Sequence, residues 1–203
     1  MPESVKVQRR PYILASWLIV AGLVGLLAAF SLTVDKFKLL EHPDTQLGCN
    51  VSFLVGCSKN LGSWQGSLFG FPNPLIGLGA WSAVLVVAVG LLTGARFSRA
   101  FWLAFNVGVL GGIALVAWLI YQSLFSLDVL CPWCMATWSV MIPTFWAVTL
   151  FNLKSGNVAL PERARSVFGS IYGWVPTITL VSYALVAAIA QWQLGWLNEI
   201  FVS

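Results

Sequence analysis

Four cysteines in two pairs are the residues of this sequence best suited to chemistry. Cys49 and Cys57 are separated by seven residues, whereas Cys131 and Cys134 form a Cys-Pro-Trp-Cys motif where a polar turn gives way to a long apolar stretch. Two thiols one helical turn apart can form a disulfide and open it again, and a helix N-terminus favours the thiolate that attacks a disulfide. The motif therefore predicts reversible dithiol chemistry at the start of a helix.

The rest of the composition indicates that a membrane surrounds these thiols. The chain has 203 residues, of which 59% are hydrophobic and 9% are charged, and its mean hydropathy is +0.85. These values exclude a water-soluble globule. We expect one all-α integral membrane domain over residues 1–203, because five charge-free stretches reach the length of about 20 residues that crosses a bilayer. These predicted spans are Tyr12–Val34, Pro74–Thr93, Phe101–Ser123, Pro132–Phe151 and Val175–Leu194.

The lysines and arginines predict the orientation, because they accumulate in the cytoplasmic loops of membrane proteins. Eight of the eleven fall on one side, and the other side has Lys36, Lys38 and Lys59. The N-terminus is therefore predicted to be cytoplasmic and Ser203 extracytoplasmic, in a multi-pass protein of the plasma (inner) membrane. The net charge of +4 reports this topology, and we expect no nucleic acid partner. The basic side has Lys6, Arg9, Arg10, Arg96, Arg99, Lys154, Arg163 and Arg165.

This topology puts all four cysteines at the extracytoplasmic face, where disulfides persist. Inert cysteines would be scattered through the spans, so their segregation favours a redox role. The outer segment 35–73 carries a glycine beside both Cys49 and Cys57 and is too apolar to be merely solvated. We interpret this segment as a mobile lid of loop and short helix that carries the first thiol pair over the mouth of the bundle.

Three motifs together resemble the vitamin K epoxide reductase (VKOR) family. They are the Cys-x7-Cys in the first outer loop, the Phe-Gly-Phe-Pro-Asn sequence at residues 69–73 before the second span, and the Cys-x2-Cys that opens the fourth. The resemblance covers residues 12–151, with the fifth span as in bacterial homologues. In bacterial members with a fused thioredoxin-like domain, that domain follows the fifth span. Because this sequence stops at Ser203, the resemblance implies a separate thioredoxin-like (DsbA-like) partner.

The resemblance also implies an activity and an order of events. Family members oxidise a partner's dithiol and pass two electrons to a membrane quinone held in a four-helix bundle, which supports disulfide formation outside the cytoplasm. Cys134 lies about 4.5 Å deeper than Cys131 from three residues of helical rise, so it is better placed to meet the quinone. The family pattern pairs Cys131 with Cys57, and Cys49 would exchange with the partner. The quinone could be menaquinone, ubiquinone or phylloquinone (vitamin K).

Two further residues are candidates for contact with the quinone. An asparagine near the position of Asn73 hydrogen-bonds the quinone in the family, but Asn73 could equally be an ordinary helix cap, because Pro74 follows it at the first helical position. Trp138 lies one turn beyond Cys134, where vertebrate relatives carry a tyrosine. Its indole keeps a hydrogen-bond donor and a flat wall but lacks the hydroxyl.

Three other functions remain as alternatives. A metal-binding membrane protein could use the four thiolates as ligands, although the seven-residue spacing and the uncharged spans argue against a metal. A structural scaffold with two permanent disulfides is a second alternative. A vitamin K epoxide or quinone reductase in the strict sense is a third, because thiol-disulfide exchange is reversible and its direction depends on the partner and on cellular potentials.

Overall fold

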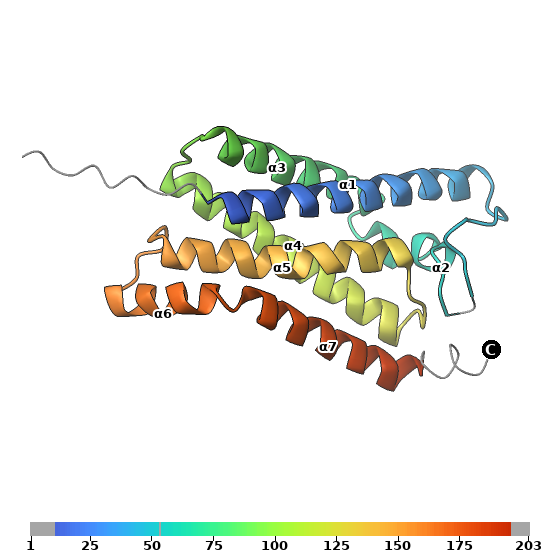
Figure 1. Ribbon diagram of the computed structural model, residues 1–203. Coiled ribbons are helices and arrows are strands. Elements are labelled where there is room, and N and C mark those ends of the chain that lie inside the picture. Colours follow the sequence, from blue (N-terminus) through green and yellow to red (C-terminus); the bar gives the residue numbers. More distant parts are fainter. Residues whose placement is uncertain (1–10, 53, 196–203) are drawn as a thin grey trace, which may run out of the picture.

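The computed structural model describes residues 11–52 and 54–195, and most of them are helical. Five helices are long and apolar enough to cross a membrane, which confirms the predicted all-α membrane fold (Figure 1). The described residues form no strand beyond one isolated bridge. Lys6, Arg9, Arg10 and Ser203, on which part of the predicted orientation depends, lie outside the described residues. The five helices are α1 (Tyr12–Glu41), α3 (Pro74–Thr93), α4 (Arg99–Phe125), α5 (Pro132–Lys154) and α7 (Val175–Leu194).

Helix α1 is longer than its predicted span. It continues for seven residues beyond residue 34, and its 30 residues extend about 45 Å, whereas the hydrocarbon core is about 30 Å thick. The polar extension is compatible with a helix because Lys38 pairs with Asp35 one turn earlier, at 3.5 Å. The helix ends at Glu41, since Pro43 disfavours a helical conformation at His42. The extension carries the chain beyond the membrane before the first cysteine.

Small residues allow α1 to pack closely on α3. Gly22 and Gly25 of α1 face the second span, and a Cβ atom on Gly25 would lie 2.2 Å from the Trp81 ring. Such small residues let membrane helices approach each other, because van der Waals packing replaces the hydrophobic effect there. Helix α1 packs against both α3 and α5, and α4 packs against α5. Because α5 also packs against α7, α5 lies at the centre of the bundle.

A proline in α5 helps to fix the fifth span. Pro143 has no N–H group, so the carbonyl of Ser139 one turn earlier loses its partner within the helix. The Tyr183 hydroxyl of α7 donates a hydrogen bond to this carbonyl. A second bond joins the same two helices, because Trp146 Nε1 donates to Ser182 Oγ at 3.3 Å. Polar groups thus position α7 on α5.

One helix has no counterpart among the predicted elements. Helix α6 (Glu162–Tyr172) contains no buried residue and lies beside the end of α5. Its charged residues cluster at its start, and Val167, Phe168 and Ile171 follow at helical spacing. This amphipathic pattern is typical of a helix that lies in the plane of a membrane surface.

The bundle has two ends with different composition (Figure 1). The lid helices α2 (Ser58–Gly62) and η1 (Trp64–Ser67) lie at one end, together with the end of α4 and the start of α5; we call this the cysteine end. The opposite end contains the α3–α4 turn, the end of α5, and α6; we call it the basic end. Its described basic residues are Arg96, Arg99, Lys154, Arg163 and Arg165.

Candidate active site

The loop that carries the first cysteine pair is closed by a disulfide and by one asparagine. Cys49 and Cys57 are joined by a disulfide, with their Cα atoms 5.8 Å apart. The Asn50 side-chain oxygen accepts hydrogen bonds from the backbone N–H groups of Cys57, at 2.9 Å, and Ser58, at 3.2 Å. The Asn50 amide nitrogen also donates to Ser58 Oγ at 2.7 Å. The side chain of Asn50 therefore holds both ends of the loop in one position.

A short main-chain bridge places this loop against the residue before Cys131. The N–H group of Gly56 donates to the carbonyl of Leu130 at 3.0 Å, and the N–H group of Leu130 donates to the carbonyl of Leu54 at 2.7 Å. This is the isolated parallel bridge between Val55 and Leu130. It joins segments that are 75 residues apart, counted from 55 to 130 in the sequence. The second loop cysteine therefore lies at the mouth of α5.

The two cysteine pairs meet at Cys57 and Cys131. Cys131 Sγ lies 3.3 Å from Cys57 Sγ, and both residues are completely buried. Cys131 and Cys134 are present as thiols, so a thiol rests against one sulfur of the loop disulfide. Thiol-disulfide exchange proceeds by attack of one sulfur on another, and this contact joins the two sulfurs that such an exchange between the pairs would require.

The chemical surroundings of Cys131 favour its thiolate. Cys131 is the N-cap residue of α5, and Pro132 occupies the first turn. A hydrogen bond from the Cys134 side chain lowers the pKa of the Cys131 thiol. Burial opposes this effect, whereas the backbone N–H groups of Cys134 and Trp133 act in the same direction as the side chain. The thiolate is the nucleophile in disulfide exchange, so the lowered pKa raises the reactive fraction.

Cys134 connects the sulfur cluster with a cavity inside the bundle. The cavity has a volume of about 150 Å³ and lies between α1, α3, α4 and α5, beneath the lid. Most of its walls are apolar, and one polar lining group, the Asn60 amide nitrogen, lies 3.9 Å from Cys134 Sγ. The lining side chains include Leu32, Ile76, Ala80, Trp81, Leu115, Leu119 and Met141 as apolar members, and Asn60, Asn73, Thr137 and Trp138 as members with polar groups.

Asn73 lines this cavity, but its side chain forms hydrogen bonds with the lid. Asn73 precedes α3 as the N-cap residue, yet its side chain forms no capping hydrogen bond. Its oxygen accepts from the N–H group of Leu68 at 2.9 Å, and its nitrogen donates to the carbonyl of Gln65 at 2.6 Å. The side chain therefore braces η1 of the lid over the cavity. One amide hydrogen remains for a molecule in the cavity, because the side-chain amide carries two.

Trp138 lies where the sequence analysis expected, one turn beyond Cys134 and on the same face of α5. Its side chain is buried and lines the cavity. Thr137 lines the cavity too, but its hydroxyl donates to the carbonyl of Trp133 at 3.1 Å within the helix. Helix α5 thus lines the cavity with one continuous face, which is formed by Cys134, Thr137, Trp138 and Met141.

Cys49 lines a second depression, on the surface. This groove has a volume of about 570 Å³ and runs between the outer part of α1 and the start of α5. We call it the Cys49 groove. Asp35 Oδ2 lies 3.6 Å from Cys49 Sγ in its wall. The other lining residues are Phe30, Ser31, Val34, Lys38, Gly48, Val51, Pro132, Trp133 and Ala136.

Comparison with known families agrees with this geometry. Residues 16–149, which contain all four cysteines and the cavity, match the family described as the vitamin K epoxide reductase family. The chain belongs to the VKOR family. No curated protein sequence gave a significant match. VKOR family proteins are membrane oxidoreductases associated with quinone substrates, so the chain is a multi-pass membrane oxidoreductase.

Sequence reasoning missed Asn60, a polar residue buried beneath the lid of this VKOR family member. The Asn60 amide nitrogen donates to Ser123 Oγ at 3.1 Å and lies 3.9 Å from Cys134 Sγ. The residue therefore links α2 with α4 and α5 beside the inner thiol. A polar residue three positions after Cys57 was the available signal, but its partners are 63 and 74 residues away.

The structure also bears on the alternative that the four cysteines bind a metal. Within residues 11–52 and 54–195, no three His, Cys, Asp or Glu side chains come together in the arrangement of a metal-ligand set. Two of the four cysteine sulfurs are bonded to each other. Thiolate ligands require free, deprotonated sulfur, so this redox state offers two thiols and not four.

Proposed function

We propose that this VKOR family protein oxidises the dithiol of a separate thioredoxin-like protein outside the cytoplasm and passes the two electrons to a membrane quinone. The electrons move from the partner to Cys49–Cys57, then from Cys57 to Cys131, and from Cys134 to the quinone. The 3.3 Å contact between Cys57 and Cys131 is the observation that carries this proposal. It supports exchange between the pairs without a large rearrangement of either.

Each exchange in this relay conserves sulfur bonds and electrons. A partner thiolate attacks Cys49 and forms a mixed disulfide with it, and Cys57 leaves as a thiolate. The second partner thiol then attacks the partner sulfur of this mixed disulfide, so the partner leaves with its own disulfide and Cys49 is reduced. The Cys57 thiolate attacks Cys131 of an oxidised inner pair and expels Cys134. Attack of Cys49 on Cys57 then restores the loop disulfide and leaves the inner pair as two thiols.

The final step regenerates the inner disulfide. Two electrons and two protons leave the Cys131 and Cys134 thiols, the quinone becomes a quinol, and a Cys131–Cys134 disulfide forms. The net reaction converts a partner dithiol and a quinone into a partner disulfide and a quinol. For a two-electron couple, a potential difference of about 30 mV corresponds to about 1.4 kcal/mol, so a modestly more oxidising quinone drives the relay.

The cavity next to Cys134 fits a quinone as the electron acceptor. Its apolar walls suit a hydrophobic ring, and the Asn73 and Trp138 side chains supply hydrogen-bond donors for ring carbonyls. Helices α3 and α4 face each other across the cavity, and the lining residue Ala80 is exposed on α3. The ring therefore has a route from the bilayer between these two helices.

The Cys49 groove supports a dithiol partner as electron donor. Cys49 is only 8% exposed, so a partner must reach it through this groove. Extended peptide next to a partner's reactive thiol would pack against Trp133 and Val51, which line it. The charge distribution supports an extracytoplasmic position for the groove, because the basic end carries five described basic residues and one carboxylate, Glu162.

Disulfide mapping of a Cys134→Ser variant tests the proposed path. Serine cannot close the inner disulfide, so after oxidation of the full-length protein we expect Cys131 to be trapped in a disulfide with Cys57. Electron transfer from a reduced DsbA-like protein to a short-chain quinone should fall by about three orders of magnitude or more. The readouts are peptide mass mapping and quinol absorbance.

A Cys131→Ser variant serves as the matched control for this experiment. It should keep the Cys49–Cys57 disulfide and form no disulfide between the pairs. A Cys49–Cys131 disulfide in the Cys134→Ser protein, or full quinone reduction by either variant, would contradict the proposed path.

Vitamin K epoxide or quinone reduction in the strict sense is the second candidate. It uses the same contact and the same direction of electron flow, and the observed state, with an oxidised loop pair and two inner thiols, is one in which the inner pair can give two electrons to a quinone or an epoxide. Incubating the reduced protein with vitamin K epoxide separates the two functions. Consumption of the epoxide with a dithiol donor would favour this second function, whereas oxidation of a DsbA-like dithiol by quinones with no consumption of the epoxide would favour the first.

A further inference from the structure

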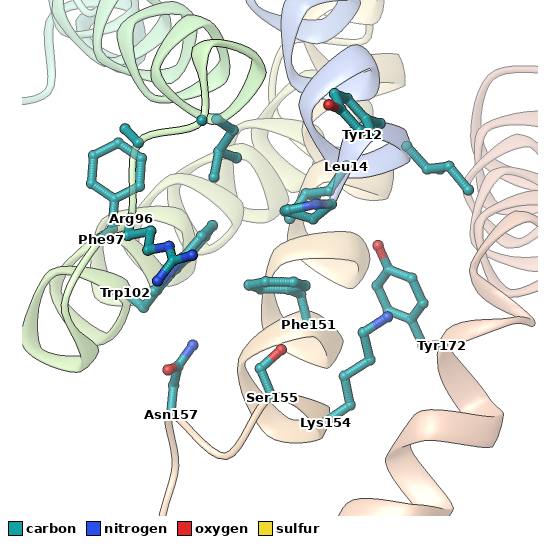
Figure 2. A pocket seen from close by; sticks show the side chains of 15 residues that line it. Tyr12, Leu14, Arg96, Phe97, Trp102, Phe151, Lys154, Ser155, Asn157 and Tyr172 are labelled. Atoms are coloured by element: carbon teal, nitrogen blue, oxygen red, sulfur yellow. The ribbon is translucent and has the colours of Figure 1, made fainter. Parts of the chain in front are cut away.

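A large cavity opens at the basic end, far from the four cysteines. It has a volume of about 920 Å³ and lies between the start of α1, the α3–α4 turn, the end of α5 and α6 (Figure 2). Its inner walls are formed by apolar side chains that include Leu14, Trp102 and Phe151. The relay has no use for this cavity, because its lining shares no residue with the cavity beside Cys134.

Two cations reach this cavity, and neither has an acidic partner among residues 11–52 and 54–195. In the view of Figure 2, the Arg96 guanidinium and the Lys154 ammonium approach from opposite sides, and Phe151 and the Ser155 hydroxyl lie between them. None of the described lining residues carries a carboxylate. In the described part of the chain, the one ion pair is Lys38–Asp35, at the other end. Within the described structure, the positive charge at this cavity therefore has no carboxylate to neutralise it.

The contacts of Lys154 with aromatic rings leave the charge of its ammonium group unneutralised. Its ammonium lies 3.1 Å from the centroid of the Tyr172 ring and 5.8 Å from that of Phe151. Aromatic faces attract a cation but do not neutralise its charge. The side chain is held on these rings, so its ammonium is positioned beside the cavity before a ligand arrives. An anion between Lys154 and Arg96 would supply the missing negative charge.

The surrounding elements place this cavity at the level of lipid headgroups. Helix α6, which contributes Tyr172, has the amphipathic pattern of an interfacial helix and no buried residue. Trp174 follows it and is exposed, and Tyr12 lines the cavity from the start of α1. Tryptophan and tyrosine concentrate at the boundary between hydrocarbon and headgroups. A cavity there with an apolar interior and a cationic rim faces the phosphate groups of the bilayer.

We propose that this cavity binds the phosphate group of an acidic membrane lipid. The phosphodiester lies between Arg96 and Lys154, with the Ser155 hydroxyl as a further hydrogen-bond donor. The planar guanidinium of Arg96 matches two phosphate oxygens, and the Lys154 ammonium acts as a point charge. The glycerol and the first acyl carbons pack on Trp102 and Phe151. The lipid thereby joins α4, α5 and α6 at this end of the bundle.

Native mass spectrometry of the full-length protein in detergent tests this proposal. The protein is titrated with phosphatidylglycerol and with phosphatidylcholine of identical acyl chains. We expect retained phosphatidylglycerol, and a loss of apparent affinity of about fivefold in Arg96→Gln and in Lys154→Gln, since each basic residue near an anionic lipid contributes a factor of this size. The conservative Lys154→Arg variant keeps the charge and should bind within about twofold of the original.

The matched control is Arg163→Gln. Arg163 is an exposed residue of α6 at the same end, and it does not line the cavity. Its replacement removes an identical charge and should change binding by less than about twofold. Equal losses in Arg163→Gln and Arg96→Gln would overturn the proposal, because the attraction would then be diffuse. Equal retention of phosphatidylcholine would also overturn it.

Competition with soluble phosphates shows whether the ligand is a lipid or a free anion. Glycerophosphoglycerol and inorganic phosphate are added at the concentration of the lipid, and we expect neither to displace phosphatidylglycerol, because they lack the acyl carbons that pack on the aromatic wall. Displacement by either compound would overturn the lipid proposal and identify a soluble phosphate as the ligand. Unchanged thermal midpoints of the variants establish that the losses are not losses of folding.

Discussion

The two ends of the bundle differ in how their reactive or charged groups are held. At the cysteine end, Cys57 and Cys131 are completely buried, and a disulfide, a β-bridge and the Asn50 side chain hold them in place. At the basic end, Arg96 is exposed, and among the described residues the side-chain contacts of Lys154 are with the rings of Phe151 and Tyr172. The cavities differ accordingly, at about 150 Å³ beside Cys134 and about 920 Å³ at the basic end.

This contrast separates two requirements of a membrane redox protein. Sulfur exchange needs two sulfurs at a fixed short distance, and cross-links between distant segments provide it. Binding of a lipid-like molecule needs space and an unneutralised charge, and loosely packed helix ends provide both. We therefore expect changes at one end to leave the function of the other end intact.

Of three further changes that test this comparison, blocking the cavity beside Cys134 is expected to have the largest effect. Ala80→Trp places an indole at an exposed position that lines this cavity, so the KM for a short-chain quinone should rise by about tenfold or more. Ala83→Trp is the control, because Ala83 is exposed on the same helix and does not line the cavity. Steady-state kinetics measure the difference. Equal KM values for the two variants would place the quinone elsewhere.

A smaller effect is expected from loosening the loop at the cysteine end. Asn50→Ala leaves the N–H groups of Cys57 and Ser58 without their acceptor, and each such hydrogen bond contributes about 1 kcal/mol. Reduction of the Cys49–Cys57 disulfide by dithiothreitol should accelerate by about fivefold or more. Asn50→Asp keeps the acceptor and should stay close to the original rate. Phosphatidylglycerol retention at the basic end should not change in either variant.

The smallest effect is a shift in pH dependence. The Cys134 side chain lowers the pKa of Cys131 by a hydrogen bond, so Cys134→Ala should raise it and leave less thiolate at a given pH. In a Cys49→Ser, Cys57→Ser background, the reaction of Cys131 with a small disulfide should therefore require a higher pH. Cys134→Ser restores a donor and should move the profile back. Identical profiles for alanine and serine would show that the hydrogen bond has no such role.

The sequence predicted the features that depend on local composition. The five apolar stretches became five helices, and the predicted 175–194 span coincides with α7 because Gly195, in the left-handed conformation, ends it. The extension of α1 was missed because residues 35–41 are too polar for a span, although they remain good helix residues. Helix α6 was missed because the search was for membrane spans, and its 11 residues contain too few apolar ones for a span. The regular spacing of those apolar residues was the signal that could have revealed it.

The site residues also divide into those that the sequence pattern revealed and those whose role depends on tertiary contacts. The segregation of four cysteines was visible in the sequence, but the role of Asn73 was not, because its partners Leu68 and Gln65 belong to a lid whose path is set by tertiary packing. Neither proposed role of Asn73, as a helix cap or as a quinone ligand, included this brace. Asn60 escaped notice for the same reason, since Ser123 reaches it only after α2 and α4 have packed.

The bridge between Val55 and Leu130 has a consequence for how this protein tolerates mutation. Its two hydrogen bonds use only main-chain atoms, so the approach of the loop to the mouth of α5 does not depend on which side chains occupy the tip of the loop. The exposed side chain of Val51 is thus free to vary without disturbing this approach. The spacing of the Cys57 and Cys131 sulfurs would be inherited unchanged through such variation.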